Sequence, residues 1–196
     1  MGRTLAQPPA LSPSRDRSVI FPAVRLQIAK SVPRSASFWR VAFLHEGADA
    51  GRGIPRALAG SIRDAARRAG FRGRDRETAA ATARDGSWLL VGLGRAPASL
   101  ARLRRALRRA VGESASRSRS RLLLVFGEGV SEDTLRALLP HLALADYAFE
   151  RYKSAPKKTG GGGRTTAVVI PPENVAAEPL AVAAREAAVV ADAVAA

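Results

Sequence analysis

Apolar residues follow two different periods along this chain. Strict alternation or a short continuous apolar run is typical of strands, whereas a repeat of about 3.6 residues is typical of helices. The first pattern predicts six strands, of which the third is the weakest because it is rich in alanine, a poor strand former. They are residues 23–30, 37–44, 76–84, 87–93, 121–127 and 165–170.

The helical period predicts four helices. In residues 54–69 and 97–111 the leucines and alanines share one face and most arginines lie off it, as in amphipathic helices that cover a core. Gly70 is expected to end the first of these. Ser131 is expected to cap a helix that Pro140 kinks or splits and that continues to about residue 152. The last helix, residues 178–196, is almost pure alanine and valine, and residues 112–121 and 153–164 are predicted as loop.

This alternation of strands and helices defines the fold class. It predicts an α/β domain built as a three-layer α/β/α sandwich, with helices on both faces of a mixed, mostly parallel sheet of about six strands. A short loop joins the first two strands, and we therefore expect them to form an antiparallel pair.

Composition limits the class of protein. The 196 residues suit one domain with tails, and the absence of cysteine excludes disulfides and thiolate metal sites and fits the cytoplasm. No apolar run is long enough to span a membrane. Residues 1–21, rich in Pro, Ser and Arg, are predicted to be a disordered tail without a secretory signal. The domain itself is expected to occupy residues 22–172.

Charge is unevenly placed along the chain. The formal net charge is +15, but residues 1–121 hold 25 Lys or Arg and 8 Asp or Glu and carry a net +17, whereas residues 122–196 are slightly acidic. Such asymmetry suggests a partner rich in negative charge. The candidate residues for binding a nucleic acid are Arg102, Arg104, Arg105, Arg108, Arg109, Arg117, Arg119 and Arg121. The alternative is that this arginine-rich helix face meets water or an acidic neighbouring domain.

Two glycines after the fourth strand resemble a dinucleotide-binding turn. Gly92 and Gly94 fit the first two positions of the Gly-x-Gly-x-x-Gly motif, but Pro97 occupies the third and cannot allow the close helix–strand contact of a glycine. No acidic residue follows at the distance that a ribose contact requires. We therefore interpret both glycines as a structural turn, with a phosphate site as the less favoured alternative.

Catalytic and metal-binding patterns are also sparse. His45 and His141 are far apart and form no zinc-binding pair, although His45 and Glu46 could form the edge of a site. Glu132 and Asp133 fall at a predicted helix N-terminus, where carboxylates complement the helix dipole. No Gly-x-Ser-x-Gly nucleophile elbow and no phosphate-binding P-loop occur.

Three ordered stretches carry a family resemblance. They are GFRGRDRETAAA (70–81), WLLVGLGR (88–95) and ADYAFERYKS (145–154), the last of which contains Tyr147, Phe149, Tyr152, Lys153 and Ser154. In order and spacing they are similar to the N-terminal domain of the leucyl (cytosol) aminopeptidases. The alanine-rich residues 173–196 resemble the connector helix toward the C-terminal catalytic domain of that family, and we expect the chain to be the front part of a longer protein.

The resemblance implies a macro-domain-like fold and a non-catalytic assembly or regulatory domain of an enzyme that removes N-terminal residues from peptides. It places the two divalent metals, zinc or manganese, and the catalytic lysine and arginine in the C-terminal domain, whose motifs are absent here. No catalytic residue, metal ligand or cofactor is therefore assigned to this chain. The implied partners are the catalytic domain and the other subunits of a hexamer. Some bacterial members also bind DNA, partly through this domain, whereas the ADP-ribose binding of other macro-like folds has no support in these residues.

Overall fold

The computed structural model describes residues 24–31, 38–116, 121–144 and 166–195. Within these ranges six strands form one sheet, in the order β1-β6-β5-β2-β4-β3. The strands are β1 (Arg25–Ile28), β2 (Trp39–Leu44), β3 (Thr78–Ala83), β4 (Gly86–Gly92), β5 (Arg121–Phe126) and β6 (Thr166–Ile170). The helices are α1 (Arg56–Ala69), α2 (Leu100–Ser116), α3 (Glu132–Ala143) and α5 (Ala177–Ala195). The predicted α/β class and the six strands are confirmed.

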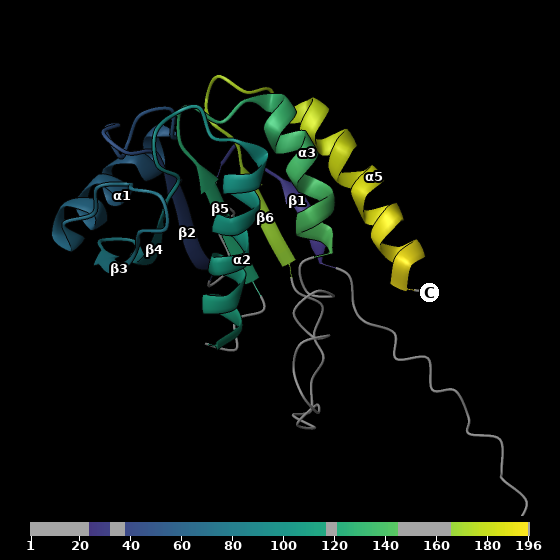
Figure 1. Ribbon diagram of the computed structural model, residues 1–196, viewed down its shortest axis with the longest axis horizontal. Coiled ribbons are helices and arrows are strands. Elements are labelled where there is room, and N and C mark those ends of the chain that lie inside the picture. Colours follow the sequence, from purple (N-terminus) through teal and green to yellow (C-terminus); the bar gives the residue numbers. More distant parts are fainter. Residues whose placement is uncertain (1–23, 32–37, 117–120, 145–165, 196) are drawn as a thin grey trace, which may run out of the picture.

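Helices cover both faces of the sheet (Figure 1). Successive residues of a strand point to opposite faces, so Val41 and Phe43 are buried with α2, α3 and α5, whereas Ala42 and Leu44 are buried with α1. The rings of Phe43 and Phe126 stack with centroids 4.6 Å apart and join β2 to β5 within the larger cluster. The architecture is therefore the predicted three-layer α/β/α sandwich.

Strand pairing differs from the prediction at the first two strands. β1 pairs with β6 and β2 lies between β4 and β5, all in parallel, so the expected antiparallel pair of β1 and β2 is wrong. β2 is apolar and mostly buried and needs a neighbour on each side, whereas the half-exposed β1 suits a sheet edge.

The antiparallel pair is instead the hairpin of β3 and β4. Ala83 and Gly86 are paired at its end, so that Arg84 and Asp85 alone connect the two strands. The indole N–H of Trp88 donates a hydrogen bond to the carboxylate of Asp85 at 3.0 Å, which ties the turn to β4. Such a short connection is typical of antiparallel neighbours.

The second helix differs from its prediction at both ends. α2 begins at Leu100 rather than Pro97, because the carbonyl of Ser99 accepts its first helical hydrogen bond. It continues to Ser116, so residues 112–116 are helical and not loop. The single Gly112 costs a formed helix only about 1 kcal/mol, too little to end it.

Both helix-end signals in the sequence are confirmed. Gly70 ends α1 in the left-handed conformation, with φ of 61°. The side chain of Ser131 accepts a hydrogen bond from the backbone N–H of Thr134 at 3.2 Å and so caps α3. Pro140 lies inside α3, which continues to Ala143. The predicted tail (1–21), the end of the third predicted helix beyond residue 144 and the predicted connection (153–164) lie outside the described residues.

Candidate functional site

Gly92 and Gly94 form a turn that packs against the loop before β3. A side chain on Gly92 would place its Cβ 1.9 Å from the carbonyl oxygen of Arg74. The N–H of Gly92 donates to the carbonyl of Glu77 at 2.8 Å, and the N–H of Gly94 donates to the carbonyl of Gly73 at 2.9 Å. A phosphate site needs unoccupied backbone donors at this turn. Since these are bonded within the protein, the interpretation of the glycines as a structural turn is supported.

The loop between β2 and α1 crosses the carboxyl ends of β5 and β6. The carbonyl of Arg52 accepts a hydrogen bond from the N–H of Glu128, and the carbonyl of Gly53 accepts one from the N–H of Glu173, at 3.2 and 2.8 Å. In doubly wound sheets this crevice, where successive connections leave for opposite faces, is the usual ligand site. Here the protein's own backbone occupies part of it, which disfavours a dinucleotide or ADP-ribose module.

His45 packs between the loops that close this end of the sheet. Its side chain is 4% exposed, and its Nδ1–H donates to the carbonyl of Gly94 at 2.9 Å. The ring lies against Gly129, where a Cβ would stand 2.9 Å from His45 Nε2. His45 holds the loops after β4 and β5 against β2, and it also lines a pocket at this end of the sheet together with Glu46.

The predicted acidic pair lies at the N-terminus of α3. Glu132 and Asp133 are in its first turn, and the Glu132 carboxylate accepts a hydrogen bond from Arg136 at 3.2 Å, one helical turn away. Among the residues that the structure describes, no three His, Cys, Asp or Glu side chains come together as metal ligands. The interpretation of the pair as a helix-dipole contact is thus supported.

The described arginine candidates belong to two elements, α2 and β5. Those of α2 lie opposite its buried arc, whereas Arg121 is exposed at the start of β5. Arg117 and Arg119 lie outside the described residues. The α2 members are Arg102, Arg104, Arg105, Arg108 and Arg109, of which Arg105 and Arg108 are the most exposed.

Two of the α2 arginines have partners within the domain. Arg102 donates to the carbonyl of Arg95 at 2.9 Å, and Arg105 lies 3.7 Å from the Asp75 carboxylate. The other three α2 arginines are Arg104, Arg108 and Arg109. In the described part of the chain no carboxylate pairs with them, so their charge is available to an anion.

The pKa of His141, in the last turn of α3, is affected by positively charged residues of α2. Burial lowers the pKa of His141, and the positive charges of Arg104 and Arg108 lower it further. The folded protein therefore favours the neutral imidazole, and protonation opposes folding.

An open pocket lies between two loops, one of which carries the predicted site-edge residues His45 and Glu46. Residues 44–50, at the end of β2 and beyond, form one wall and residues 71–74, after α1, form the other, around a volume of about 410 Å³. More than twenty positions separate the two walls in the sequence, so the predicted site edge at His45 and Glu46 did not reveal the second wall.

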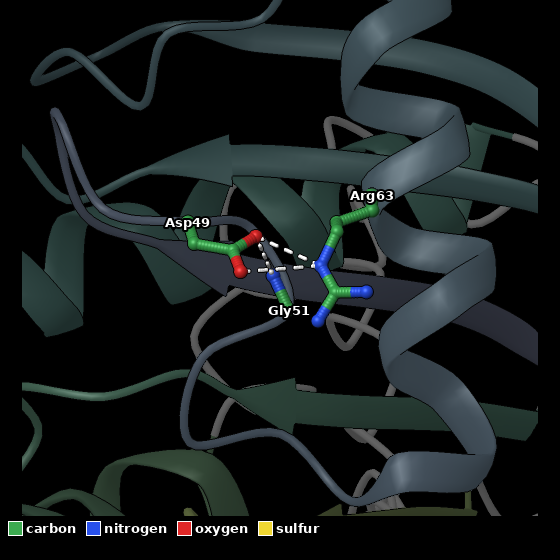
Figure 2. Close-up of polar contacts among 3 residues, drawn as sticks. All are labelled: Asp49, Gly51 and Arg63. Carbon is green, nitrogen blue, oxygen red and sulfur yellow. Dashed lines mark hydrogen bonds and ion pairs between the residues drawn. The ribbon is translucent and has the colours of Figure 1, made fainter.

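The first wall is braced from α1 (Figure 2). The carboxylate of Asp49 accepts hydrogen bonds from the N–H of Gly51 at 3.0 Å and from Arg63 Nε at 2.9 Å. The Gly51 hydrogen bond, aided by Arg63, lowers the pKa of Asp49. The loop is fixed at neutral pH, where this carboxylate is charged.

The second wall is organised by Glu77. Its carboxylate accepts hydrogen bonds from the backbone N–H groups of Arg72 and Arg74, at 3.1 and 2.9 Å. The N–H of Phe71 donates to the carbonyl of Ala66 at the end of α1. Both walls are therefore held by bonds within the domain.

The molecule is thus a three-layer α/β/α domain whose usual ligand crevice is partly closed by its own backbone. A sequence model of the N-terminal domain of the cytosol aminopeptidase family matches residues 44–156, more than half of the chain. The chain therefore belongs to this family and carries its N-terminal domain. The third motif of the resemblance, residues 145–154, lies within the match but outside the described residues.

A solved structure supports the same fold. A mutant of tomato leucine aminopeptidase superposes with a TM-score of 0.58 at 16% identity, over 87% of this chain and 36% of that one. This identity supports similarity of fold alone, and the chain spans about a third of the length of that aminopeptidase. A search of the curated proteins found no match. Within the described ranges no helix is both long and apolar enough to cross a membrane.

Proposed function

We propose that this chain is the non-catalytic assembly or regulatory domain of a metal-dependent leucyl aminopeptidase, an enzyme that removes N-terminal residues from peptides. The match of residues 44–156 to the family's N-terminal domain carries the proposal. The domain's partners are the C-terminal aminopeptidase domain and, through it, the other subunits of a hexamer.

The metals of this enzyme class, zinc or manganese, do not fit the described residues of this chain. Two histidines are present, and one of them, His45, is buried with its ring against Gly129. Zinc sites are built from converging His, Cys and carboxylate ligands. We therefore assign the metals and the hydrolytic step to the catalytic domain and none of that chemistry to this one.

The coding sequence that follows the Ala196 codon tests this assignment. It is expected to continue in frame into a domain that holds the metal ligands. A different domain at this position would contradict the proposal.

A second candidate function is binding of duplex DNA by the α2 arginines. Its support is the set of α2 guanidinium groups without carboxylate partners in the described chain, Arg104, Arg108 and Arg109. Such groups bind phosphates with little sequence selectivity and with steep salt dependence.

Fluorescence anisotropy with a labelled short duplex tests this candidate. The Kd is expected to rise steeply between low and moderate salt, and a double Arg108→Glu, Arg109→Glu variant should bind at least about tenfold more weakly. A variant with Arg56→Glu and Arg84→Glu, two exposed arginines at the start of α1 and in the β3–β4 turn, makes the same change in net charge and is the matched control. Equal binding by the double variant and the control would contradict this function.

A further inference from the structure

None of the α2 arginines lines the pocket between residues 44–50 and 71–74, although Arg105 pairs with Asp75, the neighbour of the lining residue Arg74. The pocket lies at the carboxyl end of β2, a parallel strand at the centre of the sheet. Its volume of about 410 Å³ falls in the range of small-molecule sites, which is roughly 300–1,000 Å³. The carboxyl ends of parallel strands are where open α/β sheets place ligands.

The pocket carries an excess of positive charge. Arg72 and Arg74 line it together with one carboxylate, Glu46, which lies 3.9 Å from Arg74. The carboxylate of the neighbouring Glu77 accepts hydrogen bonds from the backbone N–H groups of Arg72 and Arg74. Among the described residues, no carboxylate pairs with the Arg72 side chain. An anion bound at these arginines would balance their excess positive charge, because guanidinium groups bind carboxylate and phosphate oxygens through paired hydrogen bonds.

The pocket also has an apolar side. Leu44, at 4% exposure, is already covered by the protein, so the half-buried Phe71, which packs against the same cluster of α1 and the sheet, is the large apolar side chain that a ligand could contact. Ala48 and Ala50 complete this side with small side chains. Such a surface gains free energy by covering apolar atoms of a ligand, so the charged head of the ligand is expected to carry an apolar body.

Both walls are ordered before any ligand arrives. The Asp49 brace fixes the first wall (Figure 2), and the hydrogen bonds to Glu77 fix the second. A preformed site avoids the entropic cost of ordering its loops on binding.

We propose that this pocket binds a small organic anion, a carboxylate or phosphate group on an apolar body. The anionic group pairs with Arg72 and Arg74, and the apolar body lies against Phe71. The proposal does not rest on the aminopeptidase role, and none of the α2 arginines lines this pocket.

Amide NMR titrations of the whole chain test the proposal. Benzoate and phenyl phosphate are the probes for the two head groups, and benzyl alcohol is the neutral control. Saturable shifts of amides in residues 44–50 and 71–74 are expected with at least one anion, and the tighter probe identifies the preferred head group. Absence of saturable shifts with both anions, or equal binding of benzyl alcohol, would overturn the proposal.

Variants locate the binding energy. A double Arg72→Gln, Arg74→Gln variant is expected to bind the better probe roughly tenfold more weakly, because two exposed ion pairs are lost. Arg84→Gln removes an exposed arginine at the far turn of β3 and β4 and should bind as the wild type does. If the amide spectrum shows that the double variant is folded and its Kd is unchanged, the assignment of the anion to these arginines is refuted.

Discussion

Replacing Gly92 with alanine is expected to destabilise the domain strongly, although it adds only one methyl group. The added Cβ would stand 1.9 Å from the carbonyl oxygen of Arg74 and 2.9 Å from the carbonyl carbon of Gly73. These are backbone atoms, so the collision cannot be relieved by a side-chain rotation. The loop before β3 must move away from β4 by more than about 1 Å to restore van der Waals contact.

The magnitude follows from what that movement disrupts. Overpacking of a close contact typically costs about 1–3 kcal/mol. The same movement strains the hydrogen bonds that Gly92 donates to Glu77 and Gly94 donates to Gly73, at 2.8 and 2.9 Å, each contributing about 1 kcal/mol. The free energy of unfolding is therefore expected to fall by about 3–5 kcal/mol, a large part of the total of about 5–15 kcal/mol for a typical domain.

Urea unfolding followed by tryptophan fluorescence measures this change, because Trp39 and Trp88 are both buried and should report loss of the core. Gly60→Ala is the matched control. Gly60 is exposed in α1 with no atom within 4 Å of an added Cβ, so alanine should stabilise the helix by up to about 1 kcal/mol. If Gly92→Ala unfolds at the wild-type urea concentration, the close contact of the two loops is wrong.

Three smaller changes test other parts of the fold. Ser131→Ala removes the hydroxyl that accepts a hydrogen bond from the backbone N–H of Thr134 and caps α3. Chemical denaturation should show a free energy of unfolding lower by about 1 kcal/mol. The pKa of His141 is lowered from 6.5 on folding, so the stability of the wild type should fall as the pH drops below 6.5. Urea midpoints measured at several pH values should fall less for His141→Gln, and an equal fall of the midpoint with pH in both proteins would contradict this prediction. The pKa of Asp49 is lowered from 3.8 on folding, so the melting temperature of the wild type should exceed that of Asp49→Asn at neutral pH. The difference should vanish as acid protonates the carboxylate, and a difference that persists in acid would exclude the ion pair with Arg63 as its cause.

Local signals in the sequence predicted the elements well. The leucine and alanine stripe of α1, the glycine at its end and the cap at Ser131 act within a few residues, and the structure confirms each. The continuous apolar runs identified β4 and β5, because both strands are buried in the centre of the sheet. These features depend on periodicity and capping, which a single sequence displays.

Features that depend on distant contacts could not be predicted in the same way. Pairing of β1 with β6 joins segments at opposite ends of the chain, and the length of the loop after β1 does not report it. Glycine is required at position 92 because a side chain there would collide with the backbone of Arg74. The pocket is formed by loops on either side of α1. The arginine pattern of α2 was visible, but not that Asp75 and the Arg95 carbonyl engage two of its members.

The proposed role as a non-catalytic domain of an aminopeptidase predicts that the chain by itself does not hydrolyse peptides. Release of p-nitroaniline from leucyl-p-nitroanilide by the purified chain, with and without added Zn²⁺ or Mn²⁺, tests it most directly. We predict no release above the buffer control under either condition. Metal-dependent release that co-elutes with the folded 20.7 kDa chain would contradict the claim.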